Sequence, residues 1–206
     1  MALSHPIEPV LHPVPIARLR PTQMTVGYRE VARKRHAWRE AVDRSGADFL
    51  GRHMIPAVIG PGGTPWMIDN HHLARALHDE GVANVLISIV ARLEHLGKKR
   101  FLSFMDNRNW LHPYDAEGKR RAYKDLPRSV GKLEDDPYRS LAGETRRAGG
   151  YAKVGTPYAE FLWADFLRTR VPPRLVEKDF DKAVMKALHA AHGEHAAYLP
   201  GYCGTH

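Results

Sequence analysis

The sequence predicts an α+β fold in which a small mixed β-sheet core is followed by a helical layer. Segments rich in Val and Ile and bounded by Pro or Gly, the pattern of short strands, are confined to residues 14–95. Beyond residue 97, apolar residues recur at three- and four-residue spacing, which is typical of one helix face. We therefore expect an extended arm at 1–13, a sheet core at 14–97 and a helical extension packed on that core at 98–206.

The predicted core alternates strands with two helices. Its elements are a strand at 14–19, a helix at 28–42, the two arms of a β-hairpin at 55–59 and 66–68, a helix at 71–80 and a strand at 84–93. The first helix should stop at Asp43-Arg44-Ser45-Gly46, a run of turn-forming residues. The second should stop at Gly81, since glycine readily adopts the left-handed conformation of a helix C-cap.

The helical extension is predicted mainly from apolar stripes. The expected helices are 98–109, 136–148, 157–169 and 179–197. Thr156-Pro157 supports the start of the third helix, because threonine caps helices and proline suits the first turn. We interpret the aromatic and leucine residues of the last two helices as core packing.

The formal net charge of +8 arises mainly from residues 98–132, which contain ten Lys or Arg and four Asp or Glu. A basic excess is typical of proteins that bind nucleic acid, nucleotides or phosphorylated molecules, and equally of a well-solvated surface. Lys119, Arg120 and Arg121 lie close to Tyr123, and nucleic-acid surfaces combine charge with aromatic rings in this way. A basic loop over a phosphate pocket is an equal alternative.

The sequence favours a cytoplasmic protein without a membrane partner. Cys203 is the only cysteine, which excludes an internal disulfide and a cysteine-ligated zinc site. The first residues show no basic stretch leading into an apolar run, the pattern of a signal peptide. The longest apolar run, Val85–Ala91, is too short to span a bilayer.

The segment Ile68-Asp69-Asn70-His71-His72 carries the strongest candidate site. An apolar strand ends there and a polar turn leads directly into an amphipathic helix, whose first amides have no internal partners and carry partial positive charge. Such a helix start binds anions, and the two imidazoles add donors for phosphate oxygens. Asp69 could hold Mg²⁺ or accept a proton from a hydroxyl nucleophile. The plainer alternative is that Asp69 is an N-cap and the histidines are surface residues.

This segment and its surroundings resemble the ParB/sulfiredoxin superfamily, in which a hairpin leads into Asp-Gly-His-His-Arg or a close variant and then into a helix that begins a phosphate pocket. The chain is most similar to the putative ParB-like nucleases. The resemblance covers most of residues 14–170 and also rests on the strand at 84–93 and two later segments. Those segments are Leu133-Glu134-Asp135-Asp136-Pro137-Tyr138-Arg139-Ser140-Leu141 and Glu160-Phe161-Leu162-Trp163-Ala164-Asp165-Phe166.

The resemblance implies a phosphate-handling enzyme, either a kinase-like phosphotransferase or a nuclease. It implies that a nucleotide such as ATP or ADP, or a phosphodiester, binds at Asn70, His71 and His72, with Mg²⁺ at Asp69. Asp69 and the two histidines are then the catalytic candidates. Arg75, on the same helix, is a further candidate for the phosphate site.

Some members of this fold phosphorylate free serine and use a glutamate of the first helix as base, and the resemblance suggests Glu30 as its counterpart here. The sequence also departs from the family pattern, with Asn70 where glycine is usual and Leu73 where many relatives have arginine. It lacks the glycine-rich cytidine-nucleotide motif and an obvious helix-turn-helix, and Cys203 lies away from the phosphate-site motif, which excludes sulfiredoxin chemistry. The alternatives to an enzyme are a DNA-binding or nucleotide-sensing adaptor and an interaction domain that kept the fold.

Overall fold

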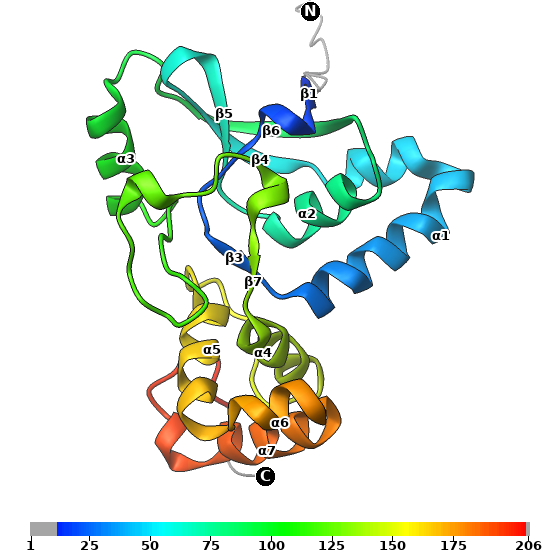
Figure 1. The fold of residues 1–206 in the computed structure, drawn as a ribbon, viewed down its shortest axis with the longest axis vertical. Helices are drawn as coiled ribbons and strands as arrows, with labels where there is room; N and C mark the ends of the chain where they lie inside the picture. The colour runs from blue at the N-terminus through cyan, green and yellow to red at the C-terminus, as the bar shows by residue number, and fades with distance from the viewer. Residues whose placement is uncertain (1–11, 205–206) are drawn as a thin grey trace, which may run out of the picture.

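The computed structural model describes residues 12–204 and confirms the predicted α+β fold class. A curled mixed sheet with its covering helices forms one part of the molecule, and the C-terminal helices form the other part (Figure 1). Residues 1–11, most of the predicted arm, lie outside the described residues, and residues 12 and 13 belong to the first strand. No helix within residues 12–204 is long and apolar enough to cross a membrane.

The main sheet holds five strands in the order β1-β6-β4-β5-β2. In that order they are β1 (His12–Pro15), β6 (Asn84–Arg92), β4 (Ile55–Gly60), β5 (Thr64–Met67) and β2 (Arg20–Pro21). β4 and β5 form the predicted antiparallel hairpin, whereas β4 pairs in parallel with β6. Parallel neighbours need a crossover connection, and it runs here through β5 and α2 (His71–Asp79), so the β5–α2 turn lies at one end of the sheet.

Alternating side chains of β4 face two different hydrophobic cores. Ile55, Ala57 and Ile59 pack with residues of α1 (Tyr28–Arg52) and α2 on one face of the sheet. Val58 packs with Phe101 and other residues of α3 (Lys98–Asn107) on the opposite face. The predicted boundary at residue 97 therefore falls between the sheet and a helix that covers it.

The C-terminal helices pack around the fully buried Trp163. They are α4 (Pro137–Arg147), α5 (Ala159–Arg170), α6 (Pro173–Lys178) and α7 (Phe180–His192). A short parallel pairing of β3 (Thr25–Val26) with β7 (Glu134–Asp135) joins this part to the N-terminal core. Asp136 follows β7 and caps α4, because its Oδ1 accepts a hydrogen bond of 2.9 Å from the Tyr138 amide. Arg139, in the first turn of α4, donates to Gln23 and to the Thr25 carbonyl, which holds this turn against residues 23–25.

Three local expectations differ from the structure. The predicted stop after residue 42 is wrong, since α1 continues to Arg52 through a kink at Ser45. Phe49 beyond the kink packs edge-on against Trp38, with 5.5 Å between ring centroids, so burial of an aromatic ring overrides the local turn signal. The predicted strand at 14–19 is cut short by a 3-10 turn at Ile16–Arg18. α6, β2, β3 and β7 were not predicted, because each is too short for a periodic pattern.

The remaining elements agree with the predictions to within a few residues, apart from the C-terminal end of the last helix. α2, α3 and α4 lie within the expected segments, and α5 begins two residues and ends one residue later than expected. α7 ends five residues early, before a 3-10 turn at Glu194–Ala196. Gly81 follows α2 with a φ of +74°, as its predicted C-cap role requires. The sheet and its flanking helices thus fix the β5–α2 turn, where the candidate site begins.

Candidate active site

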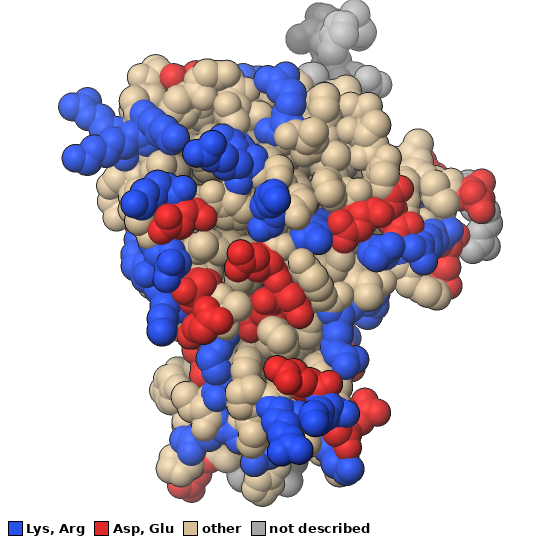
Figure 2. Space-filling model, in the orientation of Figure 1, with Lys and Arg blue, Asp and Glu red and all other residues tan. Residues whose placement is uncertain are grey.

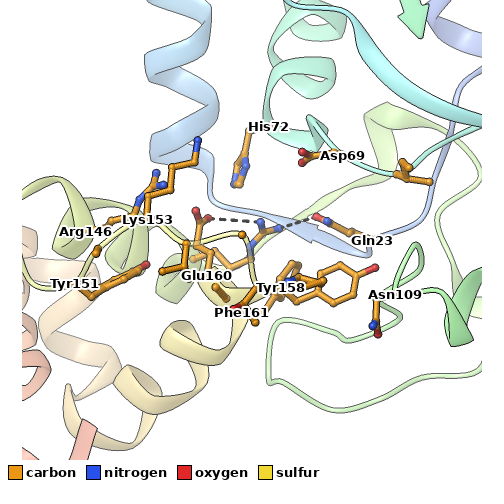
Figure 3. A pocket seen from close by; sticks show the side chains of 18 of the residues that line it. Gln23, Asp69, His72, Asn109, Arg146, Tyr151, Lys153, Tyr158, Glu160 and Phe161 are labelled. Carbon is orange, nitrogen blue, oxygen red and sulfur yellow. Dashed lines mark hydrogen bonds and ion pairs between the residues drawn. The ribbon is translucent and has the colours of Figure 1, made fainter. Parts of the chain in front are cut away.

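A cavity of about 540 Å³ lies between the β5–α2 turn and the C-terminal helices. Asp69 and His72 contribute to its wall from the turn and α2, Arg139 and Arg146 from α4, and residues 151–161 from the loop before α5 and its first turn. Figure 3 shows Asp69 and His72 on one side of this space and Glu160 on the other. A volume of this size is typical of small-molecule sites.

The turn itself is shaped by two side chains that bond to backbone. Asn70 has the left-handed conformation, with φ 61° and ψ 29°, which asparagine tolerates better than most residues. Its side-chain amide donates to the Met54 carbonyl at 3.0 Å, and its backbone amide donates to Asp69 Oδ1 at 2.7 Å. Asn70 is the N-cap residue of α2 but makes no side-chain cap bond. The Asp69 carboxylate is exposed and lines the cavity.

His71 and His72 are both held in the neutral form by backbone donors. His71 Nε2 accepts from the Thr22 amide at 3.2 Å, and His72 Nε2 accepts from the Gly27 amide at 3.0 Å. A ring nitrogen that accepts cannot carry a proton, so the proton of each ring is on Nδ1. Burial, followed by the positive charge of Arg139, lowers the pKa of both rings well below the usual value.

The two histidines nevertheless differ in position. His71 is buried, only 2% exposed, and is not part of the cavity wall. Its Nδ1 has no hydrogen-bond partner among the described residues. His72 lines the cavity and points into it (Figure 3). Of the two predicted phosphate donors, only His72 therefore faces a space where a ligand fits.

Arg139 is the central cation of the cavity, and no role was predicted for it from the sequence. The side chain is buried, with its guanidinium donating to Gln23 Oε1 at 3.2 Å and to the Thr25 carbonyl at 2.6 Å. Its ion pair with Glu160 is long, 3.6 Å, and Nε has no hydrogen-bond partner among the described residues. The guanidinium carbon lies 3.9 Å from the Phe161 ring centroid. Burial lowers the pKa of Arg139, yet arginine keeps its charge in proteins.

Two further buried oxygen atoms of cavity-lining residues lack hydrogen-bond partners among the described residues. They are Oε1 of Glu160 and the hydroxyl of Tyr158. Both residues line the cavity, as Arg139 does. Buried polar atoms are normally paired, so a group of a donor, a carboxylate oxygen and a hydroxyl without partners indicates a place for a ligand or for water. Burial raises the pKa of the Tyr158 hydroxyl, which therefore stays protonated at neutral pH.

Strained backbone is concentrated around the same cavity. Within residues 12–204, the non-glycine residues with positive φ are Asn70, Asn109 (54°) and Tyr158 (59°). Asn109 and Tyr158 line the cavity, and Asn70 follows the lining residue Asp69. A bulky residue in this conformation is a genuine outlier, and such strain clusters at functional sites.

The cavity has two chemically different ends. Arg146 and Lys153 lie at one end, and Tyr158 and Asn109 lie at the other, with Glu160 between them (Figure 3). The Tyr158 ring packs on His112, with 4.4 Å between centroids, and His112 also contacts Phe161. One end thus offers cations, and the other offers an aromatic ring with an amide.

Two of the predicted residues lie away from this cavity. Glu30 is held by Arg33 at 2.6 Å and Arg147 at 2.7 Å and does not line the cavity. Burial opposes the ionised form of Glu30, but the hydrogen bonds and charges of the two arginines outweigh it and lower its pKa. Arg75 pairs with Asp79 at 2.9 Å and also donates to the Leu133 carbonyl. Both side chains are occupied by structural partners.

The side chains near Asp69 show what kind of Mg²⁺ site the cavity could form. No group of three or more His, Cys, Asp or Glu within residues 12–204 could hold a metal ion by itself. Magnesium, however, commonly binds through one or two carboxylates together with substrate phosphates and water. The exposed Asp69 carboxylate uses Oδ1 for the Asn70 amide, which leaves Oδ2 as an oxygen donor of the required kind. These residues fit an ion shared with a substrate, and not a preformed metal cage.

The sequence and the fold are similar to those of a known family and of a protein of known structure. The family model described as putative ParB-like nuclease matches residues 12–169, a range that contains Asp69, His72, Arg139 and Glu160. Protein Atu1540 from Agrobacterium tumefaciens, known from a crystal structure, is 51% identical in sequence. The two structures superpose with a TM-score of 0.91, over 97% of this chain and 100% of that chain. No curated protein gives a match.

Proposed function

This chain belongs to the putative ParB-like nuclease family, and on that premise we propose that its cavity binds a phosphate group of a nucleotide or phosphodiester and transfers or hydrolyses it. Membership confirms the ParB-like assignment expected from the sequence. The nature of the bound phosphate compound and the chemical step are our proposals. They rest on the side chains that surround the cavity.

The observation that carries the proposal is the incomplete pairing of Arg139. A buried arginine normally has its donors satisfied, but here Nε has no partner among the described residues and Glu160 is 3.6 Å away. The planar guanidinium matches the oxygen geometry of phosphate and gives two parallel hydrogen bonds. Because the Arg139 side chain is buried, such bonds are stronger there than at the surface. Arg139 is therefore the proposed anchor for the anion.

His72 and the free amides at the start of α2 would add donors on the opposite side of the same phosphate. The neutral His72 ring carries its proton on Nδ1, so it donates without adding a charge. Arg146 and Lys153 would complement the charge of further phosphate oxygens at their end of the cavity. Donors placed in advance around a reacting phosphate stabilise the charge of the transition state.

Two carboxylates are available for proton transfer. Glu160 has a buried oxygen without a hydrogen-bond partner among the described residues, and Asp69 is exposed at the cavity wall. We assign Glu160 as the proposed base that takes a proton from a hydroxyl or water nucleophile. Asp69 is the proposed ligand of Mg²⁺, which would neutralise phosphate charge when bound. This assignment places Glu160 in the role that the family resemblance suggests for Glu30.

A ligand-binding experiment tests the proposal directly. We expect pyrophosphate, ATP, ADP, CTP or GTP to raise the melting temperature, because a ligand at a hundred times its Kd stabilises the fold by about 2.7 kcal/mol. Titrations with and without Mg²⁺ would show whether the ion enters with the phosphate. Transfer would phosphorylate a hydroxyl acceptor and leave ADP from ATP without free phosphate, whereas hydrolysis would release phosphate or cleave an oligonucleotide. Absence of any shift with all five compounds would contradict the proposal.

A further inference from the structure

The surface of α3 carries a cluster of cations that the proposed cavity does not use. Lys98, Lys99 and Arg100 occupy the first turn of α3 and are all exposed. None of the three forms an ion pair with another residue in the described part of the chain. Lys and Arg side chains gather on the flank of the molecule where α3 lies (Figure 2). The cluster therefore adds three uncompensated positive charges to one surface.

The position of this cluster is unfavourable for the helix itself. The start of a helix carries partial positive charge, and acidic residues there would be stabilising. The first turn of α3 has none. The same side chains take no part in the core, since α3 packs through Phe101, Leu102 and Met105. A stability role does not account for three cations here, whereas binding of a polyanion does.

The basic residues expected from the sequence to bind nucleic acid are better compensated. Arg120 pairs with Asp106, which also accepts a hydrogen bond from Tyr123 at 2.6 Å. Arg121 lies 3.6 Å from Asp115. These contacts hold the loop that follows α3, and Lys119 is the cation of that triplet for which the described residues show no ion pair. The first turn of α3 is consequently the stronger candidate surface.

Aromatic side chains accompany the cluster. Phe104 lies one helical turn after Arg100, on the same side of α3, and is 40% exposed. It packs edge-on against Trp110, over which the Arg108 guanidinium lies at 5.1 Å. Cations that follow a backbone, together with rings on which bases stack, are the usual features of surfaces for single-stranded nucleic acid. An anionic membrane would instead require a broader exposed apolar face.

We propose that the exposed first turn of α3, with Lys98, Lys99 and Arg100, and the Phe104 ring one turn later bind a single-stranded nucleic acid. α3 extends for about 15 Å at 1.5 Å per residue, and Asn109, two residues beyond its end, lines the cavity. A strand bound along α3 thus leads toward the cavity mouth. The proposal stands apart from the cavity chemistry, because it concerns a surface that the cavity residues do not form.

The test is fluorescence anisotropy of a labelled oligothymidylate with the full chain over a range of salt concentrations. The triple variant K98A/K99A/R100A should bind roughly tenfold or more weakly and reduce the salt slope by about 0.7 for each phosphate that is no longer neutralised. Phe104→Ala should weaken binding without changing the salt slope, because it removes stacking and no charge.

A matched control removes the same charge elsewhere. Arg174, Lys178 and Lys186 are exposed on α6 and α7, and changing these three to alanine should leave affinity within about twofold on the same salt-dependent scale. Equal losses in the two triple variants would overturn the proposal, because bulk charge would then explain binding. Unchanged affinity of the α3 triple variant would also overturn it, as would absence of oligonucleotide binding by the unmodified protein. The same holds if the α3 triple variant loses binding to anionic lipid vesicles but keeps its affinity for the oligonucleotide. Preference for duplex DNA with no effect of Phe104→Ala would overturn it as well.

Discussion

Arg139 and Glu160 face each other across 3.6 Å, an ion pair without a hydrogen bond. Arg139 comes from the first turn of α4 and Glu160 from the first turn of α5. Their nearest atoms are too far apart for direct bonding, and both side chains keep a buried polar atom without a hydrogen-bond partner among the described residues. The pair is therefore arranged to accept a third group, and the proposed function identifies that group as a phosphate with its nucleophile.

Arg139→Lys should weaken binding of pyrophosphate by about tenfold or more, since a hydrogen bond to a charged group contributes about 1.5–3 kcal/mol. Lysine keeps the charge but not the paired donors of guanidinium. Isothermal titration calorimetry measures this change. The variant should also be less stable, because Gln23 and the Thr25 carbonyl lose donors, so titrations belong well below its melting temperature. Arg174→Lys on the exposed surface of α6 is the control. Equal pyrophosphate affinity of the two variants would show that Arg139 does not bind the anion.

Glu160→Gln should lower kcat by roughly 10²–10⁴-fold, the usual contribution of a general base. The affinity for pyrophosphate should stay the same or increase, because the substitution removes one negative charge near the bound anion. Glu30→Gln is the informative comparison, since Glu30 is the base implied by the family resemblance and lies outside the cavity wall. Steady-state kinetics of both variants decides between them. A larger kcat loss in Glu30→Gln than in Glu160→Gln would contradict our assignment.

Asp69→Asn should leave the melting temperature nearly unchanged while lowering Mg²⁺-dependent activity. The side-chain oxygen of asparagine can still accept the Asn70 amide, so the turn keeps its 2.7 Å hydrogen bond. Asparagine lacks the charge with which carboxylates bind magnesium. Thermal unfolding and activity over a Mg²⁺ titration measure the two effects. If the variant reaches full activity at the same Mg²⁺ concentration as the unmodified protein, Asp69 is not a ligand of the proposed metal ion.

Tyr158→Phe should reduce nucleotide affinity by several-fold and leave pyrophosphate affinity unchanged. The hydroxyl has no hydrogen-bond partner among residues 12–204, and a neutral hydrogen bond to a ligand contributes about 0.5–1.5 kcal/mol. The selectivity follows from Figure 3, in which Tyr158 lies at the end away from Arg146 and Lys153. Calorimetry with both ligands measures it, with Tyr198→Phe, 75% exposed, as the control. A matching decrease for both ligands would show that the hydroxyl contacts phosphate instead.

Stability should fall as the pH drops below about 6.5, the usual value for histidine. Burial lowers the pKa of His71 well below that value and the pKa of His112 to about 3. In this range the unfolded chain binds protons that the folded chain does not, so the free energy of unfolding decreases by about 1.4 kcal/mol per pH unit for one such group. Urea unfolding at several pH values measures the slope. His71→Gln should reduce the slope of unfolding free energy against pH, whereas the control His36→Asn, at an exposed position, should not. A slope for His71→Gln equal to that of the unmodified protein would contradict the neutral assignment of His71.

Much of the fold could be predicted from the sequence because its elements are long enough to show a period. The β4–β5 hairpin, α2 with its Gly81 stop, β6 and the apolar stripe of α7 were all visible as patterns. Short elements were not, since two-residue strands such as β3 and β7 exist only through tertiary pairing. That pairing is what brings α4 to the β5–α2 turn.

The candidate site was only half predictable for the same reason. Asp69 and His72 belong to a local motif, and the structure places both at the cavity. Arg139 and Glu160 reach it from segments about 70 and 90 positions later in the sequence. One sequence signal for Arg139 did exist, a cation in the first turn of a helix where the dipole disfavours positive charge. The burial of His71 and the pairing of Glu30 with two arginines follow from packing that periodicity does not reveal.

A crystal structure of the protein with bound pyrophosphate tests the central claim most directly. We predict phosphate oxygens within hydrogen-bonding distance of the Arg139 guanidinium, with His72 and Asp69 bordering the anion and Glu160 next to the guanidinium. Anion density located only outside this cavity would contradict the claim, for example in the separate pocket lined by Arg29 and Arg147 or on the first turn of α3.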